Sequence, residues 1–170
     1  MLSFSLAHLP EGHSKRDVQI MPGDVDLHEQ DGFEKAIYIH YNINKVSDEV
    51  FVKANIKTQS DLICDRCIEQ FLLDIDETIN LVFTTDTQLS REENEDIYLI
   101  TEAESNINIT ESVRQTLLVT LPVKKLCKES CHGLCQYCGT NLNENSCNCE
   151  DERIDPRWEA LKKIKFNTNN

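Results

Sequence analysis

Residues 50–58 read Val-Phe-Val-Lys-Ala-Asn-Ile-Lys-Thr, and every second side chain from Val50 to Ile56 is apolar. Successive side chains of a β-strand point to opposite faces, so this alternation predicts a strand with one face in the core and the other in solvent. Antiparallel sheets commonly have that arrangement. The stretch therefore predicts an antiparallel sheet as the centre of the fold.

Further strands are predicted on both sides of this stretch. Residues 36–43, 71–76 and 79–85 are rich in β-branched and aromatic side chains, and short polar breaks separate them. That spacing favours meander pairing of neighbouring strands. Residues 96–100 are expected to add a short strand after a charged, solvated loop over residues 91–96.

Two helices are predicted after these strands. In residues 108–121 the apolar side chains fall at helical spacing, and Asn108 and Glu111 fit a capping box. This helix is expected to pack on one face of the sheet. A last helix is predicted from Asp155, with Trp158 as its packing anchor.

The predicted fold class is therefore α+β, and the chain divides into two parts. Residues 1–122 form a mostly antiparallel β body with one packed helix. Residues 123–170 form a cysteine-rich, zinc-binding tail that ends in a helix.

Charge is distributed unevenly along the 170 residues, whose net charge is −13. Residues 1–120 hold nine basic and 23 acidic side chains, whereas residues 121–170 hold eight and seven. An acidic body repels phosphate and attracts Lys/Arg-rich partners. No run reaches the roughly 18 apolar residues of a membrane span, and the first ten residues make a poor signal peptide. We therefore expect a cytoplasmic protein without a membrane partner.

The eight cysteines are the most unusual part of the composition. They are Cys64, Cys67, Cys127, Cys131, Cys135, Cys138, Cys147 and Cys149. In a reducing compartment such clustered cysteines favour metal binding, with disulfides and redox-active thiols as alternatives. A redox Cys-x-x-Cys pair normally begins a helix inside a βαβ pattern, and neither Cys64 nor Cys135 lies in one.

Residues 124–154 contain too few apolar side chains to fold by burial alone. Apart from cysteine they are Leu126, Leu134, Tyr137, Leu142 and Ile154. Each is worth roughly 1.5–3 kcal/mol when fully buried, against about 1–2 kcal/mol of backbone ordering for every residue. A structural zinc ion contributes on the order of 10–16 kcal/mol to folding in small peptides. This free energy is large enough to offset the difference between backbone ordering and burial in the segment.

One zinc site is predicted within the tail itself. Cys135 and Cys138 form a zinc knuckle, in which Gly139 lets backbone N–H groups turn towards the sulfurs. Cys147 and Cys149 supply the second pair and complete a Cys₄ tetrahedron, although Cys-x-Cys is a less common chelating pair.

The other four cysteines predict a second Cys₄ site that clamps the tail onto the body. Its ligands would be Cys64, Cys67, Cys127 and Cys131. A single zinc ion, a different pairing of the cysteines, or no metal are alternatives, and His132 either replaces a sulfur or faces solvent. All-thiolate sites leave no open coordination position, so this zinc would be structural.

The chain has no metalloprotease, P-loop or dinucleotide motif and no nucleophile set against a base, so we predict that it is not an enzyme.

Residues 62–71 read Leu-Ile-Cys-Asp-Arg-Cys-Ile-Glu-Gln-Phe. This stretch resembles the Cys-x-Arg-Cys-Leu-x-x-Phe segment of the YceD family, which in bacteria and plastids is linked to accumulation of large-subunit ribosomal RNA. Residues 112–122 are similar to its helix ending in Leu-Pro, although Gln115 stands where an acidic residue is usual. Residues 131–143 are similar to its Gly-Leu-Cys-x-x-Cys-Gly-x-Asn-Leu-Asn signature. Cys147-x-Cys149 and Asp155-Pro156-Arg157-Trp158 follow in order, and some branches of the family lack this tail.

The resemblance implies a non-enzymatic ribosome biogenesis factor that supports accumulation of 23S ribosomal RNA. A basic ribosomal protein or a pre-ribosomal particle would be the partner of the acidic body, and the tail would lie nearer the RNA. The alternative is a zinc-ribbon-like nucleic-acid-binding regulator, which the near-neutral tail disfavours because such a protein needs a basic reading surface. A redox sensor with labile zinc thiolates is a third hypothesis.

Overall fold

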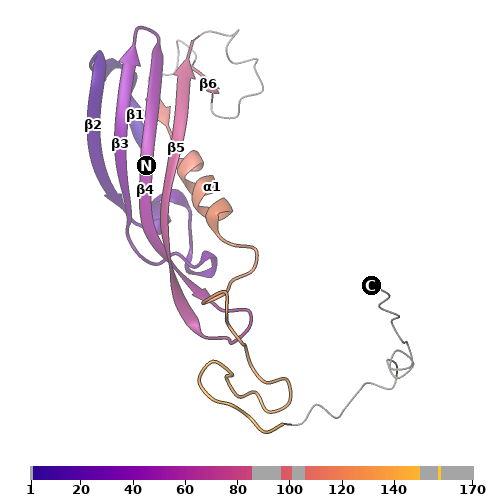
Figure 1. Ribbon diagram of the computed structural model, residues 1–170. Helices are drawn as coiled ribbons and strands as arrows, with labels where there is room; N and C mark the ends of the chain where they lie inside the picture. Colours follow the sequence, from indigo (N-terminus) through magenta and orange to yellow (C-terminus); the bar gives the residue numbers. More distant parts are fainter. Residues whose placement is uncertain (1, 86–96, 101–105, 150–156, 158–170) are drawn as a thin grey trace, which may run out of the picture.

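The computed structural model describes residues 2–85, 97–100, 106–149 and 157, and its central element is a five-stranded sheet (Figure 1). The strands, in sheet order, are β2 (Gly12–Ile20), β3 (Ile37–Val46), β4 (Glu49–Ile63), β5 (Gln70–Thr84) and β6 (Ile97–Leu99). The strands from β2 to β5 pair antiparallel in chain order. The predicted antiparallel meander is therefore confirmed for them.

The alternation that predicted β4 continues along the whole strand. Val50, Val52, Ala54 and Ile56 are buried, and so are Leu62 and the two polar residues Thr58 and Ser60. The hydroxyl of Thr58 donates to the Ala36 carbonyl at 3.1 Å, and that of Ser60 donates to the Gly32 carbonyl at 3.0 Å. Because a hydrogen-bonded hydroxyl can be buried at little cost, the strand keeps its buried face beyond the apolar stretch.

The structure corrects one detail of the predicted strands. Residues 71–76 and 79–85 do not form separate strands, because Glu77 and Thr78 between them stay paired with Ile56 and Asn55 of β4. The predicted short strand over residues 96–100 forms as β6, and it pairs parallel with β5. A parallel neighbour requires a long connection instead of a tight hairpin. The predicted charged loop over residues 91–96 lies outside the described residues.

A second layer packs against the inner face of the sheet. It contains β1 (Ser3–Ser5), β7 (Asn106–Asn108), the helix α1 (Thr110–Thr120), and the short 3₁₀ helices η1 (Leu6–His8) and η2 (Pro22–Val25). A third 3₁₀ helix, η3 (Glu29–Asp31), has no buried residue. Phe4 of β1 stands edge-on to Tyr41 of β3, with ring centroids 5.1 Å apart. Buried side chains of both layers form one hydrophobic core.

Helix α1 has the predicted amphipathic character but not the predicted cap. Val113 and Leu117 are fully buried, whereas Val119 is 84% exposed. Asn108 ends β7, and its side-chain oxygen accepts a hydrogen bond from the Thr110 N–H at 2.9 Å. Glu111 accepts a bond from Gln115 instead of reaching back towards Asn108. The predicted capping box is therefore wrong, because the helix begins at Thr110 and Ile109, not Asn108, is its N-cap residue.

The β4–β5 hairpin extends past its neighbours and carries the cysteine-rich segment at its end (Figure 1). The pairing of β3 with β4 stops at Lys57, so residues 58–63 and 70–75 continue as a two-stranded extension.

The predicted division into 1–122 and 123–170 remains a prediction. Apart from Arg157, the predicted last helix, including Asp155 and Trp158, lies outside the described residues. Within the described ranges, no helix is both long and apolar enough to cross a membrane.

Candidate metal centres

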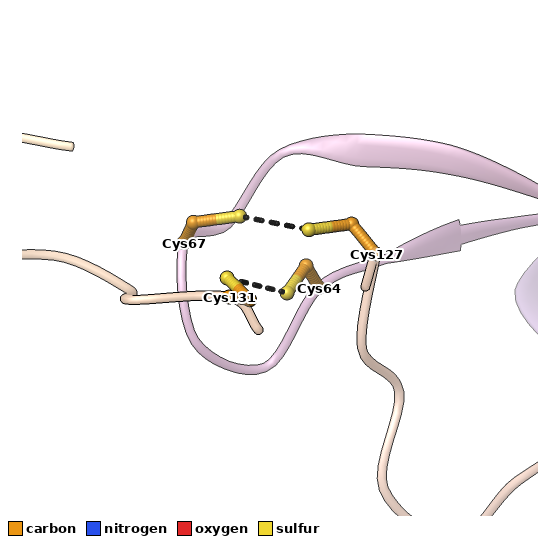
Figure 2. A group of neighbouring side chains, drawn as sticks. All are labelled: Cys64, Cys67, Cys127 and Cys131. Carbon is orange, nitrogen blue, oxygen red and sulfur yellow. Dashed lines mark hydrogen bonds between the residues drawn. The ribbon is translucent and has the colours of Figure 1, made fainter. Parts of the chain in front are cut away.

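The first candidate metal centre lies where the tail meets the end of the β4–β5 hairpin. Cys64 and Cys67 come from the turn between these strands, and Cys127 and Cys131 come from the segment after α1 (Figure 2). Their four sulfur atoms all lie within 4.8 Å of one another. The Cys64 and Cys131 sulfurs are 3.8 Å apart, and those of Cys67 and Cys127 are 3.7 Å apart.

These separations fit a metal ion better than disulfides. A tetrahedral ion with bonds of about 2.3 Å to sulfur holds its ligands about 3.8 Å apart, whereas a disulfide needs about 2.05 Å. All eight cysteines are free thiols. Cys64, Cys67 and Cys131 are buried, and among the described residues the apolar side chains packed against them are Phe71, Leu126 and Leu134. Because so few apolar side chains are buried here, a bound ion would supply most of the stabilisation of this small core.

The residues between the first two cysteines attach the tail to the hairpin. The Asp65 N–H donates to the Lys125 carbonyl at 2.8 Å, and the Lys125 N–H donates back to the Asp65 carboxylate at 2.7 Å. The Arg66 guanidinium donates to the carbonyl oxygens of Cys131 at 2.8 Å and Glu129 at 3.2 Å. The same turn thus supplies two sulfurs and the hydrogen bonds that dock the tail. Sequence reasoning did not identify this role of Asp65 and Arg66.

The second candidate centre lies wholly within the tail. The sulfurs of Cys135, Cys138, Cys147 and Cys149 also lie within 4.8 Å of one another. Cys135 is buried, Cys147 is half-buried, and Cys138 and Cys149 are exposed. The structure thus assembles the two predicted sets of four cysteines, and each could hold a metal ion. His132 belongs to neither set and is exposed, and its backbone N–H donates to Asn143.

The two Cys-x-x-Cys turns have the same backbone geometry. In the first, the Ile68 N–H donates to the Cys64 carbonyl and the Cys64 N–H donates to the Glu69 carbonyl, both at 2.9 Å. In the second, Gly139 and Thr140 make the equivalent bonds with Cys135, at 2.9 and 2.8 Å. Ile68 and Gly139 both adopt left-handed backbone, with φ of 62° and 73°. The predicted role of Gly139 in the knuckle turn is consistent with this geometry.

Ile68→Gly should stabilise the first turn, because a β-branched residue is strained at positive φ and this side chain is 67% exposed. The expected gain is about 1 kcal/mol, the lower end of the left-handed penalty for a non-glycine residue. Chemical unfolding of the metal-loaded chain measures it. Ile63→Gly is the control, because Ile63 is also exposed but lies in extended backbone, where glycine is destabilising. Equal destabilisation by both substitutions would contradict the prediction.

Hydrogen bonds divide the first cluster into sulfurs that favour the thiolate and sulfurs that favour the thiol. Burial raises the pKa of Cys64, but hydrogen bonds from the backbone N–H groups of Cys127, Cys67 and Arg66 outweigh it and bring the pKa to about 6. Burial and the neighbouring Cys131 sulfur raise the pKa of Cys127 to about 12. The sulfurs are too close for all of them to ionise together without a compensating cation.

The second cluster is divided in the same way. Hydrogen bonds from the hydroxyl and the backbone N–H of Thr140 lower the pKa of Cys138 to about 6. The neighbouring Cys138 sulfur, followed by burial, raises the pKa of Cys149 to about 12. A divalent cation would allow every sulfur of a cluster to ionise, so the electrostatics of both clusters suit a metal ion.

The molecule is thus a two-layer β-sheet protein whose hairpin end and tail assemble two all-cysteine clusters. A sequence model described as large ribosomal RNA subunit accumulation protein YceD matches residues 52–165, which include all eight cysteines. The chain therefore belongs to the YceD family. The name of the family supports a ribosome-related role.

Several curated proteins resemble the chain over part of their length. An uncharacterized protein of Mycobacterium leprae is 26% identical over 125 residues, which are 74% of this chain and 57% of that protein. An uncharacterized protein of Mycobacterium tuberculosis is 24% identical over 119 residues, 70% of this chain and 57% of that protein. The chloroplastic YCED homolog 1 of Arabidopsis thaliana, named as a large ribosomal RNA subunit accumulation protein, is 29% identical over 59 residues, 35% of this chain and 18% of that protein. The matched region thus spans little more than half of each mycobacterial relative. No solved structure matches the chain.

Proposed function

We propose that this protein is a non-enzymatic ribosome biogenesis factor that supports accumulation of large-subunit (23S) ribosomal RNA. The observation that carries the proposal is the family match over residues 52–165, because this region holds the long hairpin, α1 and both cysteine clusters. The chloroplastic relative bears the same description in its name. The protein would therefore act during assembly of the large ribosomal subunit.

The cysteine clusters are proposed to hold one structural zinc ion each. Four thiolates fill the coordination sphere of zinc and leave no position for a substrate or a reactive water. The first ion would fasten the tail to the hairpin, and the second would fold the tail itself. Zinc would therefore act by shaping a binding surface, which suits a factor that assembles other molecules rather than transforming them.

The proposed partner is a basic ribosomal protein, alone or within a pre-ribosomal particle. Residues 1–120 carry a net charge of −14, which favours Lys/Arg-rich partners and opposes direct binding to phosphate. The tail carries exposed Lys124 and Lys128 beside the first cluster. These two lysines are proposed to lie nearest the RNA, as ancillary contacts.

A deletion strain tests the proposed function directly. We expect its ratio of large-subunit to small-subunit ribosomal RNA to fall, and a plasmid copy of the unchanged gene to restore it. The tagged protein should also co-purify with a ribosomal protein or a pre-ribosomal particle, and this association should weaken as salt screens the charges. A normal ratio and a normal subunit profile in the deletion strain would contradict the proposal.

Charge-reversed variants separate the proposed roles of body and tail. Glu29 and Glu34 are exposed on the body, and Lys124 and Lys128 are exposed on the tail. Glu29→Lys/Glu34→Lys should weaken capture of the basic protein, whereas Lys124→Glu/Lys128→Glu should weaken only the RNA-dependent part of particle association. Identical behaviour of both variants would refute this division of roles.

A further inference from the structure

The segment that joins the two clusters folds back onto the first one. The Leu134 N–H donates to the Arg66 carbonyl at 3.0 Å, and the Leu142 N–H donates to the Gly133 carbonyl at 2.9 Å. Gly133 has a φ of 75°, and a Cβ atom there would lie 2.9 Å from the Arg66 carbonyl oxygen. Glycine therefore permits this close approach of the tail to the first Cys-x-x-Cys turn.

Asn143 contacts a sulfur of the first cluster, although it lies between two cysteines of the second. Its side-chain nitrogen is 3.3 Å from the Cys131 sulfur, and its side-chain oxygen accepts the His132 N–H at 2.9 Å. The accepted bond fixes the orientation of the amide, so that its NH₂ group faces the sulfur. Asn143 is half-buried, which shields this N–H···S contact from water.

Asn141 holds Asn143 in this position. The Asn141 side-chain oxygen accepts bonds from the Asn143 backbone N–H at 3.0 Å and from its side-chain nitrogen at 2.9 Å. The Asn141 side-chain nitrogen is 3.4 Å from a carboxylate oxygen of Glu69, on the hairpin side of the first cluster. Both asparagines lie in the loop between Cys138 and Cys147, whose two ends belong to the second cluster.

We propose that Asn143 is a positioning residue for the metal ion of the first cluster, and that it couples the two clusters. The proposal rests on the zinc binding put forward above. An ion in the second cluster fixes both ends of the loop over residues 139–146 and thereby holds Asn143 against Cys131. The amide N–H then stabilises the thiolate form of Cys131, as hydrogen bonds around metal-bound ligands generally do.

The first test measures metal affinity in the full-length, reduced chain. Zinc is titrated against a chelator, Co(II) absorption reports thiolate coordination, and Cys64→Ser and Cys138→Ser variants assign the two steps. Asn143→Ala should weaken binding at the first cluster about 10- to 100-fold, the usual cost of losing such an outer hydrogen bond. Asn143→Asp keeps the acceptor for His132 but replaces the donor with a negative charge, so it should weaken binding at least as much.

Asn145→Ala is the matched control for these variants. Asn145 is the same residue type in the same loop, and its side chain is exposed. Among the residues that the structure describes, its one hydrogen bond runs from its backbone N–H to the Asn141 carbonyl. Its replacement should leave both affinities unchanged. Far-UV circular dichroism checks that the sheet is intact in every variant, so that a loss of metal affinity cannot be due to unfolding of the whole chain.

The second test measures the coupling. A Cys138→Ser/Cys149→Ser chain, which lacks the second site, should bind its remaining ion about as weakly as Asn143→Ala does. Adding Asn143→Ala to that chain should cause little further loss, because both changes release the same contact. By linkage, destroying the first cluster should weaken the second by the same factor.

Unchanged first-cluster affinity in Asn143→Ala and Asn143→Asp overturns the proposal, and so do fully additive losses in the combined variant. In both cases the unchanged chain still binds two ions, so the zinc proposal survives. An unchanged chain that binds fewer than two ions instead overturns the zinc binding on which the coupling rests.

Discussion

Cys64→Ser is expected to lose one metal ion per chain and to release the tail from the β4–β5 hairpin, while the sheet stays folded. Structural zinc is worth on the order of 10–16 kcal/mol in zinc-finger peptides. In the part of the chain that the structure describes, only the apolar side chains of Phe71, Leu126 and Leu134 pack against the buried sulfurs. Without the ion, this apolar contact and a few hydrogen bonds between tail and hairpin remain. These bonds are made by Asp65 with Lys125, by the Arg66 guanidinium, by Leu134 with the Arg66 carbonyl and by Asn141 with Glu69. They are too weak to hold the tail.

Two measurements check this result. Elemental analysis gives the metal content per chain, and limited trypsin digestion probes Lys124, Lys125 and Lys128, which flank Cys127 at the junction. Cys138→Ser is the matched control, because it also removes an ion but leaves the first cluster complete. At saturating zinc it should keep the junction protected. Equal metal content in Cys64→Ser and the unchanged chain, or equally fast cleavage of both variants, would contradict the prediction.

Leu117→Ala is expected to destabilise the body by about 2–5 kcal/mol, the usual cost of emptying a buried leucine site. Leu117 is fully buried in the core between α1 and the sheet, one helical turn after the equally buried Val113. The surrounding strands are held by continuous ladders and can collapse only partly into the cavity.

The control lies on the opposite side of the same helix. Val119 is 84% exposed, so Val119→Ala removes apolar atoms from solvent and should change stability by no more than about 0.5 kcal/mol. Urea unfolding followed by circular dichroism gives both values, and an unchanged slope shows that the midpoint shift reports stability. If Val119→Ala lowered the free energy of unfolding as much as Leu117→Ala, the side of α1 that carries Leu117 could not be the side packed against the core.

Local patterns predicted the features that depend on neighbours in the chain. The alternation in β4 identified its buried face, and the helical spacing of Val113 and Leu117 identified the buried side of α1. The cysteine spacings identified the knuckle turn at Cys135 and the two sets of four sulfurs. Each of these follows from the geometry of one element, so the residue order alone contains the information.

Features that depend on distant parts of the chain were missed or mistaken. Ser3 pairs with Asn108 across more than one hundred residues, and α1 begins at Thr110 with Ile109 as its N-cap residue. The parallel pairing of β6 and the continuity of β5 through Glu77 likewise depend on neighbouring strands rather than on local composition.

The alternating sheet, the amphipathic helix and the two sets of cysteines with chelating spacing can all be predicted from the order of the residues. The docking of the tail by Asp65 and Arg66 is visible only in the folded chain, and so is the contact of Asn143 with Cys131. The left-handed backbone of Ile68, which matches that of Gly139 in the other turn, also appears only there. Strand, helix and chelate geometry repeat over a few residues. A hydrogen bond between segments, in contrast, forms only after the whole chain has brought its donor and acceptor together.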